Sequence, residues 1–211
     1  KSRKLRCWGR NDYGETDAPK GKFRSVSAAY YVTCALRANG RVACFGYGFY
    51  GVDDPPSRTF KSIHAHAYGE HACGVLLSGK ALCWGDNDYG KGDEPGGKFR
   101  SVQTGAYHAC GIRPNSRVKC WGYDGGYGEL GPSAGKVRAV SLGYYVTCAI
   151  KRNRKLDCFG YDSYGVDQEP PGKYRSISLG EEHACAVRTN GRVRCWGDNG
   201  DGETDVPPGL K

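Results

Sequence analysis

The chain has 211 residues and a formal net charge of +9, with 38% hydrophobic residues, 33 Gly, 11 Cys and no Met. We expect this length to form one domain over residues 1–211. The abundant Gly and aromatic residues disfavour a helical bundle, and no apolar run approaches the ~20 residues of a membrane-spanning helix. Lys1 stands where an initiator Met would stand, without a signal-like apolar run, so we expect a mature fragment whose targeting segment has been removed.

Taken in chain order, the sequence repeats with a period of about 37 residues, which is typical of solenoids, propellers and arrays. Each copy predicts three short strands: a Ser-rich strand, a strand that holds one Cys, and a strand that ends in Cys-Trp-Gly or Cys-Phe-Gly. A loop rich in Gly, Asp and Pro follows, and no stretch shows the 3.6-residue period of a helix. A partial copy is expected at 5–22 and full copies at 23–59, 60–98, 99–136, 137–173 and 174–211.

Copies that are three repeats apart in the chain resemble one another. The first and fourth share Tyr-Tyr-Val-Thr-Cys-Ala, and the second and fifth share His-Ala-Cys. This pattern predicts a duplicated triplet and an all-β propeller of three-stranded blades. The ring has either six positions with one incomplete blade, or five blades with an extra strand. Neighbouring blades would cover the sheet faces that one blade cannot bury alone.

The cysteines form five pairs with one spacing, ten positions from the first Cys to the second. A turn signal such as Asn39-Gly40 lies between them, so each pair is expected to sit opposite one another in a hairpin and to form a disulfide within a blade. Zinc is disfavoured because no C-x2-4-C knuckle occurs, and reduced core thiols are the other alternative. Disulfides predict a secreted or extracellular protein. Cys7 has no local partner, which leaves three alternatives: a link between two chains, a bond to a segment outside this sequence, or a free thiol. The expected pairs are Cys34 with Cys44, Cys73 with Cys83, Cys110 with Cys120, Cys148 with Cys158, and Cys185 with Cys195.

The repeated pattern S-V-S-A-G-x-x-H-x-C-A-L-x-x-x-G-x-V-x-C-W-G-x-N-x-Y-G-E resembles the regulator-of-chromosome-condensation repeat in its short, cysteine-bearing secreted form. The resemblance covers nearly all of the chain from Leu5 onward. It implies a β-propeller similar to bacterial inhibitory propellers, plant crinkly-type receptor ectodomains and a nuclear exchange factor for a small GTPase. These relatives do not share a function, so the resemblance implies the fold alone.

Two further repeated positions predict structural roles. The aromatic residue after the second Cys is expected to pack between blades, since it recurs in register. His stands two positions before the first Cys in three copies, and Thr stands directly before it in the other two, which favours a hydrogen-bonding role over catalysis. The aromatic set is Trp8, Trp84, Trp121 and Trp196, with Phe45 and Phe159 in the same position, and the histidines are His71, His108 and His183.

The second copy carries two extra residues before its first Cys, which brings His64, His66, Glu70 and His71 close in sequence. An H-x-H pair on a strand points both rings to one side, so His64, His66 and His71 are candidates for a zinc or copper site and for a metal-dependent enzyme. No P-loop, dinucleotide fingerprint or nucleophile elbow occurs. We therefore favour a non-enzymatic protein without a cofactor.

Tyrosines are the candidate partner-binding residues, because a tyrosine ring buries area while its hydroxyl bonds. Two sets are expected, each clustering on a face of the ring. The first, between the first and second strands, is Tyr30, Tyr31, Tyr68, Tyr107, Tyr144 and Tyr145. The second, after the third strand, is Tyr47, Phe49, Tyr50, Tyr123, Tyr127, Tyr161 and Tyr164.

Basic residues gather at three places: residues 1–6, 20–24 and 151–155. Such clusters bind acidic proteins, heparan-type anionic glycans or nucleic acid, and the expected extracellular setting disfavours nucleic acid. The prediction is a secreted protein that occludes a macromolecular partner, such as an inhibitor or a host-directed effector. The alternative is a glycan-binding module. The candidate anion-binding residues are Lys1, Arg3, Lys4, Arg6, Lys151, Arg152, Arg154 and Lys155.

Overall fold

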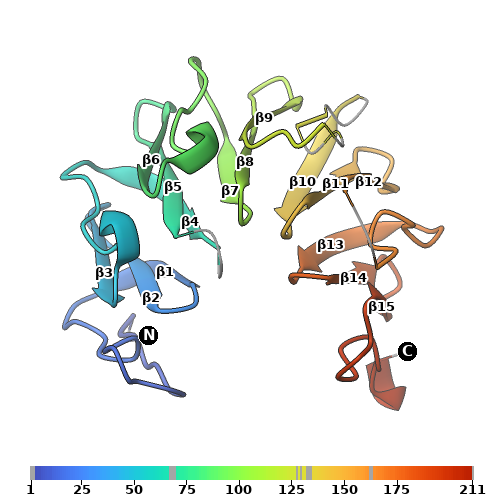
Figure 1. Ribbon diagram of the computed structural model, residues 1–211, viewed down its shortest axis with the longest axis horizontal. Coiled ribbons are helices and arrows are strands. Elements are labelled where there is room, and N and C mark those ends of the chain that lie inside the picture. The colour runs from blue at the N-terminus through green and yellow to red at the C-terminus, as the bar shows by residue number, and fades with distance from the viewer. Residues whose placement is uncertain are drawn as a thin grey trace.

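The protein is an arc of five three-stranded antiparallel sheets, in which each first strand lies nearest the centre and each third strand lies outermost (Figure 1). The computed structural model describes residues 3–66, 70–126, 128, 130–131, 135–161 and 164–210, without the side chain of Phe49. Within this part of the chain the remaining elements are three 3-10 turns, η1 (Phe49–Gly51), η2 (Asp88–Gly90) and η3 (Pro208–Leu210). The all-β propeller architecture predicted from the repeat is thus confirmed.

The strands follow the copies in order. Residues 3–22, which include the partial copy, form no strand. None of the described segments is a helix with the length and apolarity that crossing a bilayer requires. The strands are β1 (Phe23–Ala28), β2 (Val32–Arg37), β3 (Val42–Gly46), β4 (Phe60–Ala65), β5 (His71–Leu76), β6 (Ala81–Gly85), β7 (Ser101–Thr104), β8 (His108–Ile112), β9 (Val118–Gly122), β10 (Val137–Leu142), β11 (Val146–Lys151), β12 (Leu156–Gly160), β13 (Tyr174–Leu179), β14 (His183–Arg188) and β15 (Val193–Gly197).

Each sheet is closed by a disulfide between its second and third strands. The two cysteines are direct partners in the ladder, and their Cα atoms lie 4.0 Å apart in four sheets and 4.1 Å apart in the fifth. Directly opposed residues in an antiparallel pair are close enough for this bond, so the ten-position spacing and a turn with an odd number of residues together determine the pairing. All five predicted disulfides are present: Cys34 with Cys44, Cys73 with Cys83, Cys110 with Cys120, Cys148 with Cys158, and Cys185 with Cys195.

The core lies between neighbouring sheets, and the repeated tryptophan is part of it. The indole Nε1 of Trp84 donates to the carbonyl of Val52 at 3.0 Å, that of Trp121 to Lys91 at 3.1 Å, and that of Trp196 to Val166 at 2.9 Å. Each acceptor lies in the segment that leaves the preceding sheet. The predicted packing between blades is found at these three positions, whereas Trp8 is 87% exposed.

Every sheet has two ends, and the odd number of strands determines what lies at each. The loop between the first and second strands lies at the same end as the residues that follow the third strand; we call this the loop face. The hairpin turn between the second and third strands lies at the other end, beside the start of the first strand; we call this the turn face. The pairing of Phe23 with Arg37 and of Val32 with Gly46 shows both ends of the first sheet.

Candidate functional site

Tyrosines from three neighbouring sheets form one cluster on the loop face. Tyr107 stacks on Tyr145 with ring centroids 5.0 Å apart and an angle of 12°, and it meets Tyr144 edge-on at 5.0 Å. Offset-stacked and edge-to-face contacts at these distances are favourable. The central ring therefore connects loops from different blades. The cluster consists of Tyr89, Tyr107, Tyr123, Tyr144, Tyr145 and Tyr161.

Hydrogen bonds and a buried ion pair stabilise this cluster from below. The hydroxyls of Tyr107 and Tyr144 lie 3.0 Å apart. That bond and burial raise the pKa of Tyr144, and burial followed by Tyr107 raises the pKa of Tyr145 to about 12, so both hydroxyls stay protonated. The Lys91 ammonium lies 5.8 Å from the centre of the Tyr107 ring and pairs with Asp86 at 2.5 Å. A buried ion pair thus contacts the central ring of the cluster.

At one edge of the cluster a pocket of about 180 Å³ opens on the loop face. Four tyrosines and two carboxylates line it, together with Val146. A hydrogen bond to Glu182 raises the pKa of Tyr164. Aromatic faces beside carboxylates attract cations, and the volume suits the end of one side chain. The polar and aromatic lining is Tyr144, Tyr145, Tyr161, Tyr164, Glu181 and Glu182.

A second group of tyrosines lies at the N-terminal side of the loop face. Tyr13 meets Tyr31 at 5.0 Å and Tyr47 at 5.4 Å, and Tyr30 meets Tyr31 at 4.3 Å. Tyr50, which is 64% exposed, lies on the same face after β3. A pocket of about 430 Å³ beside this group is lined by residues that include Cys7, Trp8, Tyr30 and Tyr31. Cys7 is partly buried and forms no disulfide within the chain, so a link between two chains stays a prediction.

The structure combines the two predicted tyrosine sets instead of separating them. Both sets lie on the loop face, because the first loop and the exit from the third strand share one end of each sheet. Sequence reasoning missed Tyr13 and Tyr89, although Tyr13, Tyr50, Tyr89 and Tyr164 all lie six positions after the second Cys of a copy and share the signal Tyr-Gly. Tyr68, Tyr127 and the side chain of Phe49 lie outside the described residues.

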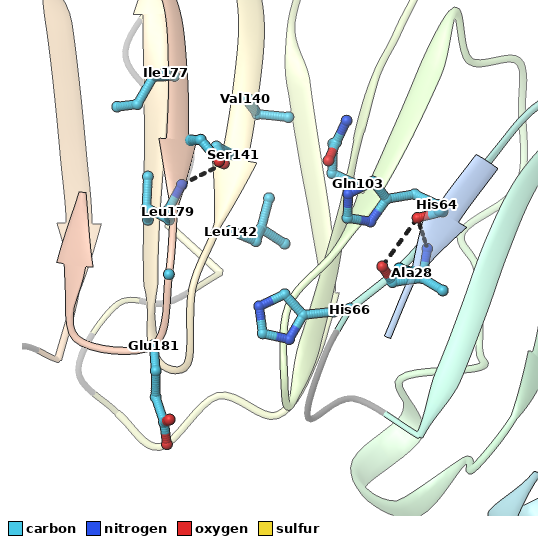
Figure 2. Close-up of a pocket in the computed structure, with 14 residues that line it drawn as sticks. Ala28, His64, His66, Gln103, Val140, Ser141, Leu142, Ile177, Leu179 and Glu181 are labelled. Carbon is cyan, nitrogen blue, oxygen red and sulfur yellow. Dashed lines mark hydrogen bonds between the residues drawn. The ribbon is translucent and has the colours of Figure 1, made fainter. Parts of the chain in front are cut away.

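The centre of the arc holds a pocket of about 360 Å³ between the first strands of the sheets. Figure 2 shows His64 and Gln103 on one side of this pocket and Ile177 and Leu179 on the other. Its hydroxyl groups bond to neighbouring sheets: Ser27 to the backbone of Ala65, and Ser141 to the amide of Leu179. These polar groups tie the sheets together.

Of the three predicted metal ligands, His64 contacts the neighbouring strand β7. His64 Nδ1 accepts the amide hydrogen of Thr104 at 3.1 Å and lies 3.0 Å from its hydroxyl, so one ring nitrogen is already used between β4 and β7. Within the described ranges no three His, Cys, Asp or Glu side chains are grouped so that they could hold a metal ion. His64 occupies the position of Ser27 and Ser141 in their blades and likewise joins two sheets. A metal ion at His64, His66 and His71 stays a prediction.

His108 has the hydrogen-bonding role expected of the histidine two positions before the first Cys. Its Nε2 lies 2.7 Å from the hydroxyl of Thr147 in the next blade, at the position that Ala109 holds in its own blade. Burial lowers the pKa of His108 to about 3, and burial lowers the pKa of His64 and of His66 to about 4. These rings are neutral and structural.

The predicted basic residues lie at the surface, mostly on the turn face. Arg152 and Lys155 are exposed at the turn between β11 and β12, Arg154 is partly buried there, and Lys151 pairs with Asp157 at 3.0 Å. In the N-terminal segment Arg3, Lys4 and Arg6 are exposed, and Lys1 lies outside the described residues. The carbonyl of Arg3 accepts the amide of Phe23, which places this segment beside the first sheet.

Comparisons with known proteins agree on the fold. The family model for the regulator of chromosome condensation (RCC1) repeat matches residues 67–91, 99–129, 137–166 and 174–203. The chain is 26% identical to the ectodomain of the Physcomitrella patens receptor kinase CR4, with a TM-score of 0.77 over 93% of this chain and 57% of that one. The chain thus spans 57% of the length of this moss ectodomain.

Two further solved structures are similar. The CRINKLY ectodomain of the Arabidopsis thaliana receptor kinase ACR4 is 26% identical, with a TM-score of 0.76 over 92% of this chain and 73% of that one. A structure of yeast RCC1 (Prp20) bound to Kap60 is 16% identical, with a TM-score of 0.73 over 89% of this chain and 58% of that one, and shares the fold alone. The curated proteins contain no match to the sequence.

Proposed function

The chain belongs to the RCC1 repeat family, and from that premise we propose that it is a non-enzymatic extracellular protein that binds another protein through its loop face. The fold of this family serves mainly binding and exchange. Five disulfides favour an oxidising compartment, and the similar crinkly structures are receptor ectodomains.

The observation that carries this proposal is the pocket lined by four tyrosines, Glu181 and Glu182. Tyr161 and Tyr164 are 44% and 46% exposed, so the aromatic surface is accessible at the rim of the pocket. A Lys or Arg side chain of a partner would find ring faces around its stem and carboxylates at its charged end. We therefore expect a partner that inserts a basic side chain here.

The surrounding tyrosines supply the rest of the contact area. Tyr89 is 62% exposed at one side of the pocket's cluster, and Tyr30 and Tyr47 are about half exposed further along the loop face. Tyrosine loses little conformational entropy on binding and is enriched where binding energy concentrates. A protein bound on this face would be blocked sterically without being chemically changed, which is how an inhibitor or a host-directed effector acts.

The test is affinity capture from the extracellular fluid that the protein meets, followed by a binding titration with each purified partner. Tyr161→Ala removes one wall of the pocket, and Tyr50→Ala is the matched control, an exposed tyrosine on the same face outside the pocket. Loss of a central aromatic anchor costs about 2 kcal/mol, so we expect Tyr161→Ala to weaken binding about 30-fold and Tyr50→Ala to change it little.

Two results would contradict this proposal. A partner bound equally by the native protein and by both variants would place the contact away from the loop face. Equal weakening of binding by both variants would support a contact on the loop face but would reject the pocket as its anchor. Circular dichroism of each variant checks that the sheets are intact.

A further inference from the structure

The basic residues of the chain are concentrated on the turn face. Each blade contributes two segments to the turn face: three residues around the start of its first strand, and five residues of its hairpin turn. These ten segments contain 20 of the 31 Lys and Arg residues and none of the 22 Asp and Glu residues. The rest of the chain holds eleven basic and 22 acidic residues, a net charge of −11. The segments are 22–24, 37–41, 59–61, 76–80, 98–100, 113–117, 136–138, 151–155, 173–175 and 188–192.

Hydrogen bonds connect these segments from one blade to the next. The amide of Phe60 donates to Gly40 in the preceding turn at 2.7 Å, and the amide of Phe99 donates to Gly79 at 2.7 Å. The amides of Val137 and Tyr174 repeat this bond to the turns before them, at 2.8 Å each. The ten segments therefore form one continuous strip, which we call the basic arc, along the turn face of all five sheets.

A backbone irregularity directs basic side chains outward along this arc. The register between first and second strands shifts immediately after the first residue, so one residue of the first strand has no partner in the ladder. A β-bulge of this kind re-aims the side chain that it carries. The residue at the shift is basic and exposed in each case: Arg24, Lys61, Arg138 and Arg175.

In three blades an arginine is held in a fixed position on the arc. The Arg113 guanidinium lies 4.8 Å from the centre of the Phe99 ring and donates to the carbonyl of Gly96 at 3.1 Å. Arg37 over Phe23 and Arg188 over Tyr174 repeat both contacts. An arginine already ordered in this way loses less freedom when it binds an anion.

The positive charges of the arc have little acidic neutralisation, and the arc has no exposed aromatic rings. Among the ion pairs of the described residues, only the one between Lys151 and Asp157 involves the arc. Among the large hydrophobic residues that are exposed in the described chain, one, Leu77, belongs to the arc, and none of the aromatic ones does. Single-stranded nucleic acid is bound by stacking of its bases on aromatic side chains, which this surface lacks.

We propose that the basic arc is a binding site for an extended, sulfated glycan chain. A linear polyanion can follow the curved strip and meet basic residues from successive blades, and the disulfides favour the extracellular setting where such glycans occur. The site lies on the face opposite the tyrosines, so this inference does not depend on the proposed function.

The test uses size-fractionated heparin oligosaccharide as the probe and titration calorimetry at several salt concentrations. The triple variant Arg100→Gln, Arg138→Gln and Lys155→Gln removes three exposed charges of the arc. Its matched control, Arg58→Gln, Lys119→Gln and Arg194→Gln, removes three exposed charges elsewhere. We expect the arc variant to bind about tenfold more weakly, and its slope of log affinity against log salt to fall by up to about three. The control should change both quantities little.

Equal weakening by the arc variant and the control would overturn the proposal, because it would show attraction to net charge instead of a site. A DNA duplex of the same total charge is titrated in parallel. Duplex binding as tight as that of the oligosaccharide, with the same dependence on the arc, would reject a glycan site in favour of a nucleic-acid site. The duplex is also titrated against a variant whose loop-face tyrosines are replaced. If the duplex still binds this variant, the nucleic-acid site is independent of the loop face, and the result does not bear on the protein-binding proposal.

Discussion

Replacing Trp121 by Phe tests how the sheets are joined. The indole ring is buried, with 6% of its surface exposed, and its Nε1 donates to the carbonyl of Lys91 at 3.1 Å. Phe fits this position, since Phe45 and Phe159 occupy it in other blades. The substitution leaves the buried carbonyl without this donor, which costs about 1–3 kcal/mol, and loses part of the apolar contact, about 1 kcal/mol.

We therefore expect the free energy of unfolding to fall by about 2–4 kcal/mol in Trp121→Phe, measured by guanidinium unfolding followed by circular dichroism. Trp8→Phe is the matched control, because Trp8 carries the same Cys-Trp-Gly motif but is 87% exposed, and its effect should stay within about 0.5 kcal/mol. If the two variants had equal stability, the hydrogen bond between blades would not contribute as argued.

Three other predictions concern stability. Lys91→Met should cost about 3–5 kcal/mol, because it leaves Asp86 buried without its partner. Arg10→Met, at an exposed ion pair, should change the stability little. Thermal melts of both variants measure this difference, and equal melting temperatures would contradict it. The pKa of His108 is about 3 and that of His64 about 4 in the folded protein, below the unfolded value near 6.5, so the unfolded chain binds more protons below that pH. Acidification from pH ~7 to ~5 should therefore lower the free energy of unfolding by about 2 kcal/mol per histidine, and a pH-independent value would refute this. Reduction should abolish cooperative unfolding, because five disulfides that each contribute about 2–3 kcal/mol match the whole stability of a typical domain, and a reduced protein that still melted cooperatively would be unexpected.

The repeated features of the fold could be predicted from the sequence because each one appears five times. The spacing from Cys34 to Cys44 recurs in every copy, through to Cys185 and Cys195, so the hairpins, the disulfides and the three-stranded sheets followed from local geometry. The roles of Trp121 and His108 followed from their register in the repeat. A feature that recurs in every copy can be predicted from the sequence, because a wrong interpretation of one copy would disagree with the other copies.

The candidate surfaces were less readable because they depend on how blades are placed beside one another. Glu181 and Glu182 look like loop residues in the sequence, and only the adjacent blade brings them to Tyr144. Arg24 looks like any surface arginine until the register shift directs it outward. The contact of His64 also depends on a neighbouring strand, because its Nδ1 accepts the amide hydrogen of Thr104.

The odd number of strands in each sheet has a consequence for how the protein can change in length. The chain enters each blade at the turn face and leaves it at the loop face. It must therefore run back along the full height of the sheet before the next blade begins. These crossings are uniform: 16 positions separate Cys44 from Phe60, Cys83 from Phe99 and Cys158 from Tyr174, and 17 separate Cys120 from Val137.

The loops between first and second strands return at the same end and have no such crossing. Phe60 and Cys73 are 13 positions apart, whereas Phe23 and Cys34 are 11 apart, so the second blade carries two additional residues at this place. Insertions should therefore be tolerated in these loops and poorly tolerated in the crossings. Changes in length should therefore occur mainly on the loop face. There they would alter the binding surface without altering the spacing between blades.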